Sequence, residues 1–188
     1  MVDRRDYKYP DTQAYDAVVK SLNDNDVTVR DISKVVYNLQ KKYIKIPSME
    51  YVDKIVIDVL HKREVLNNAL VGLEIDRLAS EHKLDEPLQS IVEHDLGAFG
   101  VDETLALGIA NIYGTIGITN YCGLDTNKQG IVKILDQRTD RVTTFIDDIV
   151  GSVAGAASAK IAHENSWYVK KSSSVEDELF HFIFILQI

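Results

Sequence analysis

The chain has 188 residues, of which 45% are hydrophobic and 27% charged, a mixture typical of one globular domain with a substantial core. Its formal net charge of −8, with no cluster of Lys and Arg longer than a pair, argues against a nucleic-acid partner, because a phosphate backbone requires a basic face. The only cysteine, Cys122, excludes a disulfide framework within the chain and indicates a reducing, cytoplasmic environment.

Residues 11–43 predict two amphipathic helices. The first covers about residues 11–23, where apolar side chains recur at three- and four-residue spacing after a proline. Thr28 should cap the second helix, because Asp31 follows three residues later, in the position that completes a capping box. The apolar stripe of this second helix extends to Tyr43. We expect both helices to pack their apolar sides against a core.

Three more helices are predicted in the next fifty residues. One begins at Ser48, a longer one covers about residues 62–82, and a short one lies near residues 86–93. Apolar residues at helical spacing form one side of the long helix. Its acidic residues, Asp76 among them, should therefore point mostly to solvent.

Small residues characterise the second half of the sequence. A helix that begins near Asp147 carries Gly151, Gly155 and Ala159 at intervals of four, which leaves one smooth side that another backbone can approach closely. A helix with so few polar groups on any side is normally central and buried.

The longest uncharged run covers residues 104–124, which is long enough to span a bilayer. Its glycines and asparagines, and the acidic pair directly before it, favour a buried segment of a protein core over a transmembrane helix. We therefore expect no membrane span.

These patterns predict an all-α protein: a compact multi-helix bundle in which a central small-residue helix is surrounded by the others. We expect a single helical domain over residues 1–165 and a C-terminal tail over residues 166–188, with a strand-like apolar run at 180–186. The apolar tail and the small-residue helices make a homo-oligomer the expected state.

Carboxylates gather at helix starts in the second half. Asp95 precedes a glycine-containing turn, Asp102 and Glu103 begin the next helix, and Asp147 and Asp148 begin the small-residue helix. Taken singly, each pair is typical of a helix N-terminus, where the helix dipole favours negative charge. Beside such apolar helices, however, several ionised carboxylates would repel one another and would lose their hydration. A divalent cation would relieve both effects.

The type of these side chains suggests which cation and which chemistry. Carboxylate oxygens are hard ligands that suit Mg²⁺, with Mn²⁺ as an alternative. Ions of this kind can clamp a phosphoryl group during its transfer, and Lys128, in a turn-rich stretch between the two acidic pairs, could steady the phosphate as a point charge. The expected partner is a phosphate-containing small molecule or lipid headgroup.

The order and spacing of these residues resemble the phosphatidylglycerophosphatase A family. Its distinctive pieces are the Asp102-Glu103 pair after Asp95 and the Ile-Asp-Asp-Ile-Val segment at residues 146–150, and the likeness covers about residues 95–160. Typical members of the family are integral membrane proteins, whereas this chain has a charged helical N-terminal half. It is therefore similar to a soluble, cytosolic branch related to that family.

The resemblance implies a magnesium-dependent phosphatase that removes the terminal phosphate of phosphatidylglycerophosphate. It also implies roles for individual residues. Lys128 would face the phosphate, and Lys128 and Asp148 are the candidate catalytic residues. The implied metal ligands are Asp95, Asp102, Glu103, Asp147 and Asp148.

Two other functions stay open at this point. An all-α nucleotide pyrophosphohydrolase also uses acidic helices and magnesium, but it requires a Glu-Glu-x-x-Glu motif that this sequence lacks. A non-catalytic interaction or regulatory protein could retain the acidic metal site without turnover.

Overall fold

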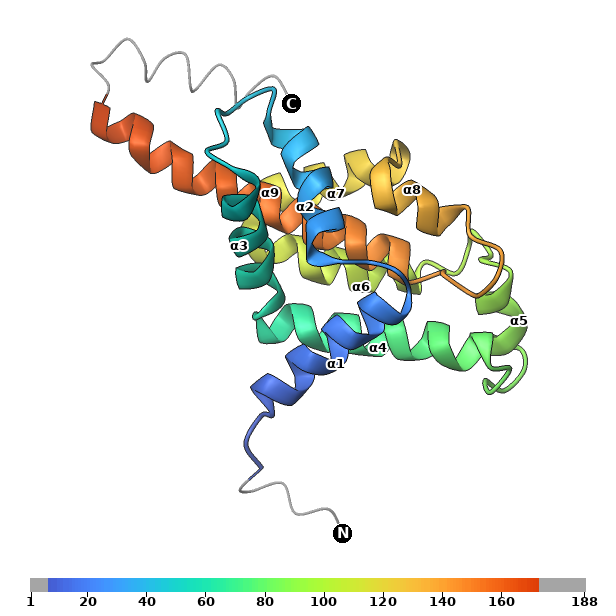
Figure 1. The fold of residues 1–188 in the computed structure, drawn as a ribbon. Coiled ribbons are helices and arrows are strands. Elements are labelled where there is room, and N and C mark those ends of the chain that lie inside the picture. The colour runs from blue at the N-terminus through green and yellow to red at the C-terminus, as the bar shows by residue number, and fades with distance from the viewer. Residues whose placement is uncertain (1–6, 173–188) are drawn as a thin grey trace.

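The computed structural model describes residues 7–172, with the side chains described as far as residue 165. In this part of the chain every regular element is helical, which confirms the all-α prediction. The elements in chain order (Figure 1) are α1 (Asp11–Asp24), α2 (Val29–Gln40), α3 (Met49–Leu60), α4 (Arg63–Ser80), α5 (Leu88–Glu93), α6 (Val101–Ala110), the 3₁₀ turn η1 (Asn111–Tyr113), α7 (Gly114–Thr126), α8 (Gly130–Asp136) and α9 (Ile146–Ser172).

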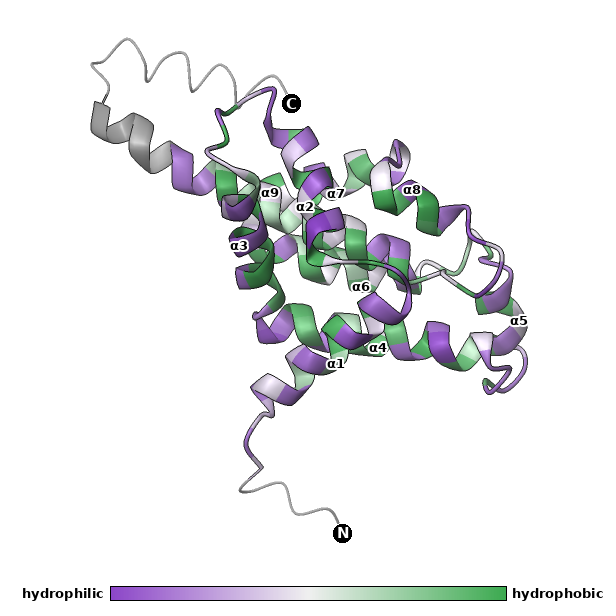
Figure 2. Ribbon diagram, in the orientation of Figure 1, coloured by the Kyte–Doolittle hydropathy of each residue, from purple (hydrophilic) through white to green (hydrophobic). Residues whose placement is uncertain are grey.

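Helix α9 is the centre of the bundle, as the sequence predicted. Residues 146–159 are all buried, and α9 packs against α2, α3, α4, α6, α7 and α8. Figure 2 shows hydrophobic or neutral residues along the middle of α9, between the acidic pair in its first turn and the hydrophilic residues towards its C-terminal end. At Gly155 an added Cβ would lie 2.9 Å from the backbone nitrogen of Tyr121, so the small-residue side of α9 lets the backbone of α7 approach closely.

The helix-start signals of the N-terminal half act as predicted. Thr28 and Asp31 form a capping box at the start of α2, with the Asp31 backbone N–H donating to the Thr28 hydroxyl at 3.2 Å. The hydroxyl of Ser48 accepts from the backbone N–H of Tyr51 at the start of α3. The prediction for Tyr43 was wrong, because α2 ends at Gln40 and the Tyr43 side chain lies beyond it, exposed.

Asp76 of α4 also differs from the prediction, because its side chain is buried, with 5% of its surface exposed. Its carboxylate accepts hydrogen bonds from the backbone N–H groups of Phe145 at 3.1 Å and Ile146 at 2.9 Å. These are donors at the start of α9 that have no partner within their own helix. Helix α4 therefore supplies the cap that α9 needs, and burial raises the pKa of this carboxyl well above its usual range.

The uncharged run of residues 104–124 continues α6, forms η1 and makes up most of α7. In the described residues no helix has the length and apolar character needed to cross a membrane. The run was expected to be a buried core segment, and this holds only for the side of it that faces the core. Leu107 and Ile116 each keep 38% of their surface exposed.

Helix α9 is the last element of the described residues and continues to Ser172. The predicted apolar run at residues 180–186 lies outside the described part of the chain.

Candidate metal centre

The first turns of α6 and α9 bring three carboxylates together. Helix α6 begins after Gly100, whose φ of 62° is in the left-handed region that favours glycine, and its first turn carries Asp102 and Glu103. Helix α9 packs along α6 and carries Asp148 in its own first turn. One carboxylate oxygen from each of Asp102, Glu103 and Asp148 lies within 4.8 Å of the other two. The predicted convergence of the two acidic pairs is thus confirmed for these three residues, named here the carboxylate cluster.

Two members of the carboxylate cluster are buried, Glu103 is half-buried, and the cluster is incompletely hydrogen-bonded. Asp102 and Asp148 expose only 6% and 5% of their surfaces. The Asp102 Oδ1 and Glu103 Oε2 atoms are buried and accept no hydrogen bond within the part of the chain that the structure describes. A buried oxygen without a partner is costly, and ionised carboxylates that lie close together also repel one another.

The cluster fits a small divalent cation. Oxygen ligands lie about 2.0–2.1 Å from Mg²⁺ and about 2.3–2.6 Å from Ca²⁺, so two oxygens on one ion are at most about 4–5 Å apart. The 4.8 Å bound on the spacing in the cluster lies inside the limit for Ca²⁺ and slightly exceeds the limit of about 4 Å for Mg²⁺. The donor set consists of carboxylate oxygens alone, which suits a hard cation. Two of the three residues, Asp102 and Glu103, also carry the buried oxygens that have no hydrogen-bond partner in the described residues.

The pKa values of the cluster carboxyls also favour a bound cation. Burial, followed by the neighbouring Glu103 carboxyl, raises the pKa of Asp102 to about 7. Burial, followed by the charge of Asp147, raises the pKa of Asp148 to about 8. Near neutral pH these side chains therefore retain protons that a bound cation would displace.

Asp147 faces a different partner from its neighbour Asp148. Its carboxylate accepts a hydrogen bond from the Lys128 ammonium at 2.7 Å, and the same ammonium donates to Asp136 at 2.6 Å. Burial raises the pKa of Asp147 to about 6, although Lys128 acts to lower it. The Lys128 side chain keeps 23% of its surface exposed, so solvent still reaches it. Lys128 is thus held by two aspartates, and one of them, Asp147, directly precedes Asp148 of the carboxylate cluster.

Asp95 lies at the rim of the site. It is exposed, its backbone has a φ of 45°, and the charges of Lys128, Glu103 and Asp136 act on its carboxyl. Of the five predicted ligands, three therefore converge as one group. Asp147 is paired with Lys128, and Asp95 flanks them.

Tyr121 of α7 is a site residue that the sequence did not indicate. Its hydroxyl donates a hydrogen bond to Asp148 Oδ1 at 3.0 Å, and its side chain is buried. Burial and the nearby Asp148 charge raise the pKa of the phenol, so that it stays protonated and remains a donor. In the sequence Tyr121 stands in the uncharged run, where nothing distinguishes it from a core aromatic residue.

Comparisons with known proteins extend the resemblance beyond the acidic segments. The family model described as Phosphatidylglycerophosphatase A matches residues 27–163. The chain is 48% identical to the uncharacterized protein YutG of Bacillus subtilis over 143 residues, which are 76% of this chain and 86% of that protein. The crystal structure of YpjQ from Bacillus subtilis is 40% identical, with a TM-score of 0.81, and the match covers 86% of this chain and all of that one. The low temperature requirement C protein from Listeria monocytogenes is also 40% identical, with a TM-score of 0.78 over 81% of this chain and 97% of that one.

Proposed function

The chain belongs to the phosphatidylglycerophosphatase A family, and on this basis we propose that it is a metal-dependent phosphatase that hydrolyses a phosphate monoester. Phosphatidylglycerophosphate is the first candidate substrate. The observation that carries the proposal is the carboxylate cluster, in which two buried oxygens have no hydrogen-bond partner in the described residues. An acidic group of this kind has no evident role in packing, but it is what a metal-assisted hydrolysis requires.

The three residues of the carboxylate cluster are the proposed metal ligands. Asp102, Glu103 and Asp148 would hold Mg²⁺, with Mn²⁺ as the alternative, and Tyr121 would fix the orientation of Asp148 by its hydrogen bond. A divalent cation held there supplies Lewis-acid polarisation of the phosphate and lowers the pKa of the attacking water.

The remaining predicted residues have supporting roles in this proposal. Lys128 would contact the phosphate as a point charge while Asp136 and Asp147 hold its ammonium in place. The paired carboxylates keep this lysine charged, because their hydrogen bonds raise its pKa despite the opposing effect of burial. Asp95, at the rim, would complete the acidic set on the solvent side.

Phosphate release under controlled metal conditions tests the proposal. Release would be measured from phosphatidylglycerophosphate in detergent and from a panel of soluble phosphate monoesters, with chelator, with Mg²⁺ and with Mn²⁺. We expect metal-dependent turnover and a loss on the order of 100-fold or more in Asp148→Asn, which removes a ligand charge. Asp16→Asn makes the same substitution at an exposed position on α1 and should retain full activity.

Two results would refute the catalytic role. The first is an absence of turnover on every substrate with either metal, in a sample that still binds the metal by calorimetry. Such a sample would contain a structural metal site. The second is full activity of Asp148→Asn.

A further inference from the structure

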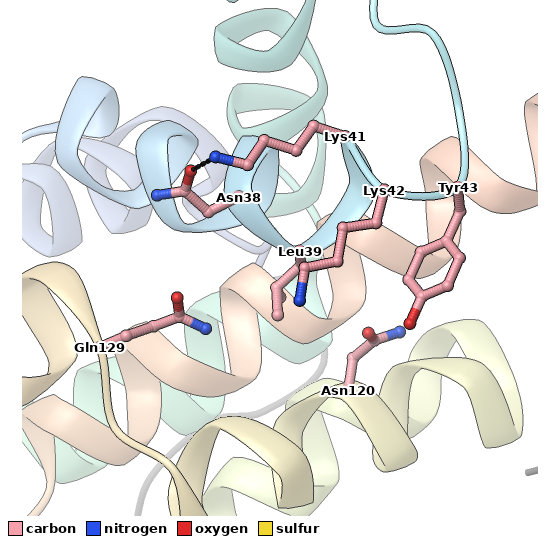
Figure 3. Close-up of a pocket in the computed structure, with 7 residues that line it drawn as sticks. All are labelled: Asn38, Leu39, Lys41, Lys42, Tyr43, Asn120 and Gln129. Atoms are coloured by element: carbon pink, nitrogen blue, oxygen red, sulfur yellow. Dashed lines mark hydrogen bonds between the residues drawn. The ribbon is translucent and has the colours of Figure 1, made fainter.

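A surface pocket of about 270 Å³ lies apart from the carboxylate cluster (Figure 3). It is formed by the end of α2 and the three residues after it, by Asn120 of α7 and by Gln129 in the link before α8. None of its lining residues is acidic, although the chain has 29 Asp and Glu against 21 Lys and Arg. Two of its lining residues are lysines, so the pocket is locally cationic on an acidic protein.

The polar side chains of this pocket converge on one space. Figure 3 shows the Lys42 side chain running into the pocket past Leu39, with the Gln129 amide directed inward from the facing wall. Tyr43 and Asn120 also line the pocket. The Lys41 ammonium donates a hydrogen bond to Asn38, another residue of the pocket wall, at 2.7 Å. Among the described residues, no carboxylate forms an ion pair with Lys42.

The backbone explains why this pocket is separate from the metal centre. Gln129 has an extended conformation, with φ −142° and ψ 159°. Consecutive side chains of an extended chain point to opposite sides. Lys128 accordingly reaches Asp136 and Asp147, whereas Gln129 lines the pocket. The link between α7 and α8 thus presents one side chain to each site.

We propose that this pocket is a second, metal-independent anion site that binds a phosphate monoester group through the Lys42 ammonium and the Gln129 amide. Both groups donate hydrogen bonds, and an ammonium–phosphate hydrogen bond is charge-assisted. The volume is slightly below the 300–1,000 Å³ typical of pockets for drug-sized ligands, which limits the ligand to about the size of a phosphorylated headgroup. The proposal does not depend on the phosphatase assignment, because it involves none of the carboxylate cluster.

Titration of the full chain in the presence of a chelator tests this site without interference from bound metal. Inorganic phosphate and glycerol 1-phosphate would be added in one arm, and vesicles containing phosphatidic acid in a neutral lipid in the other. Side-chain amide signals of Gln129 and Asn120 would be followed by NMR, and affinity by calorimetry. Binding in the first arm identifies a free phosphate ester as the ligand, and binding in the vesicle arm alone identifies a lipid headgroup.

Matched lysine variants determine whether the binding is specific. Lys42→Gln should weaken the affinity about tenfold, the loss expected for one charge-assisted hydrogen bond. Lys54→Gln makes the same change at an exposed position on α3 outside the pocket and should change affinity less than about twofold. The proposal is overturned if neither arm binds, if Lys42→Gln binds as well as the unaltered protein, or if Lys54→Gln weakens binding equally.

Discussion

The close contact of α7 with α9 makes Gly155→Ala a sharp test of the central-helix architecture. A Cβ at Gly155 would lie 2.8 Å from the carbonyl oxygen of Gly117, and 2.9 Å and 3.2 Å from the backbone nitrogen and Cα of Tyr121. These are backbone atoms, so no rotation of a side chain can relieve the overlap, and α7 must shift. Overpacking typically costs about 1–3 kcal/mol, and the clash with backbone places this site near the upper end. Alanine in place of glycine within a helix returns about 1 kcal/mol. We expect a net loss of about 1–2 kcal/mol in the free energy of unfolding.

Gly123→Ala provides the matched control, because it makes the same change within α7. No atom lies within 4 Å of a Cβ added at Gly123, so only the gain in helix propensity remains, and the variant should be more stable by about 0.5–1 kcal/mol. Urea unfolding followed by far-UV circular dichroism would compare the two variants with the unaltered protein at constant m-value. If Gly155→Ala is as stable as the unaltered protein, α7 does not pack on α9 as described.

Two further predictions concern the carboxylate cluster. Tyr121→Phe removes the hydroxyl that donates to Asp148, so the affinity for Mg²⁺ or Mn²⁺ measured by calorimetry should fall about 10- to 100-fold. The melting temperature without added metal should change little. An unchanged metal affinity would exclude a positioning role for Tyr121. Without added metal, the protein should lose stability as pH rises from 5 to 9. The folded chain retains the protons of Asp102 and Asp148 up to pH values of about 7 and about 8, whereas the unfolded chain releases them near pH 4. The stabilisation is complete below the unfolded pKa and is lost as pH passes the folded values, and added Mg²⁺ should raise the melting temperature most at the alkaline end. Melting temperatures measured with chelator and with Mg²⁺ across this range would check both statements, and a metal-free protein that becomes more stable towards pH 9 would contradict the first.

Local interactions explain why so much of the fold was predictable. The Thr28 capping box, the Ser48 cap and the apolar stripes of the outer helices depend on residues within a few positions of one another. The small-residue pattern of α9 likewise indicated a helix with neighbours on every side, and residues 146–159 are all buried. The single domain over residues 1–165 and the homo-oligomer stay predictions.

The sequence by itself determined the helices, the central position of α9 and the acidic pairs at the starts of α6 and α9, because periodicity, capping and composition are properties of the chain. Only the tertiary structure decided how the carboxylates are shared. It brought Asp102, Glu103 and Asp148 together, and it placed Asp147 in an ion pair with Lys128. It also turned Asp76 inward to cap α9 and placed Tyr121 against Asp148. The hydrogen bonds of Tyr121 and Asp76 join residues 27 and 70 positions apart in the sequence. Such contacts depend on how the helices pack, and the spacing of residues along the sequence carries no information about that packing.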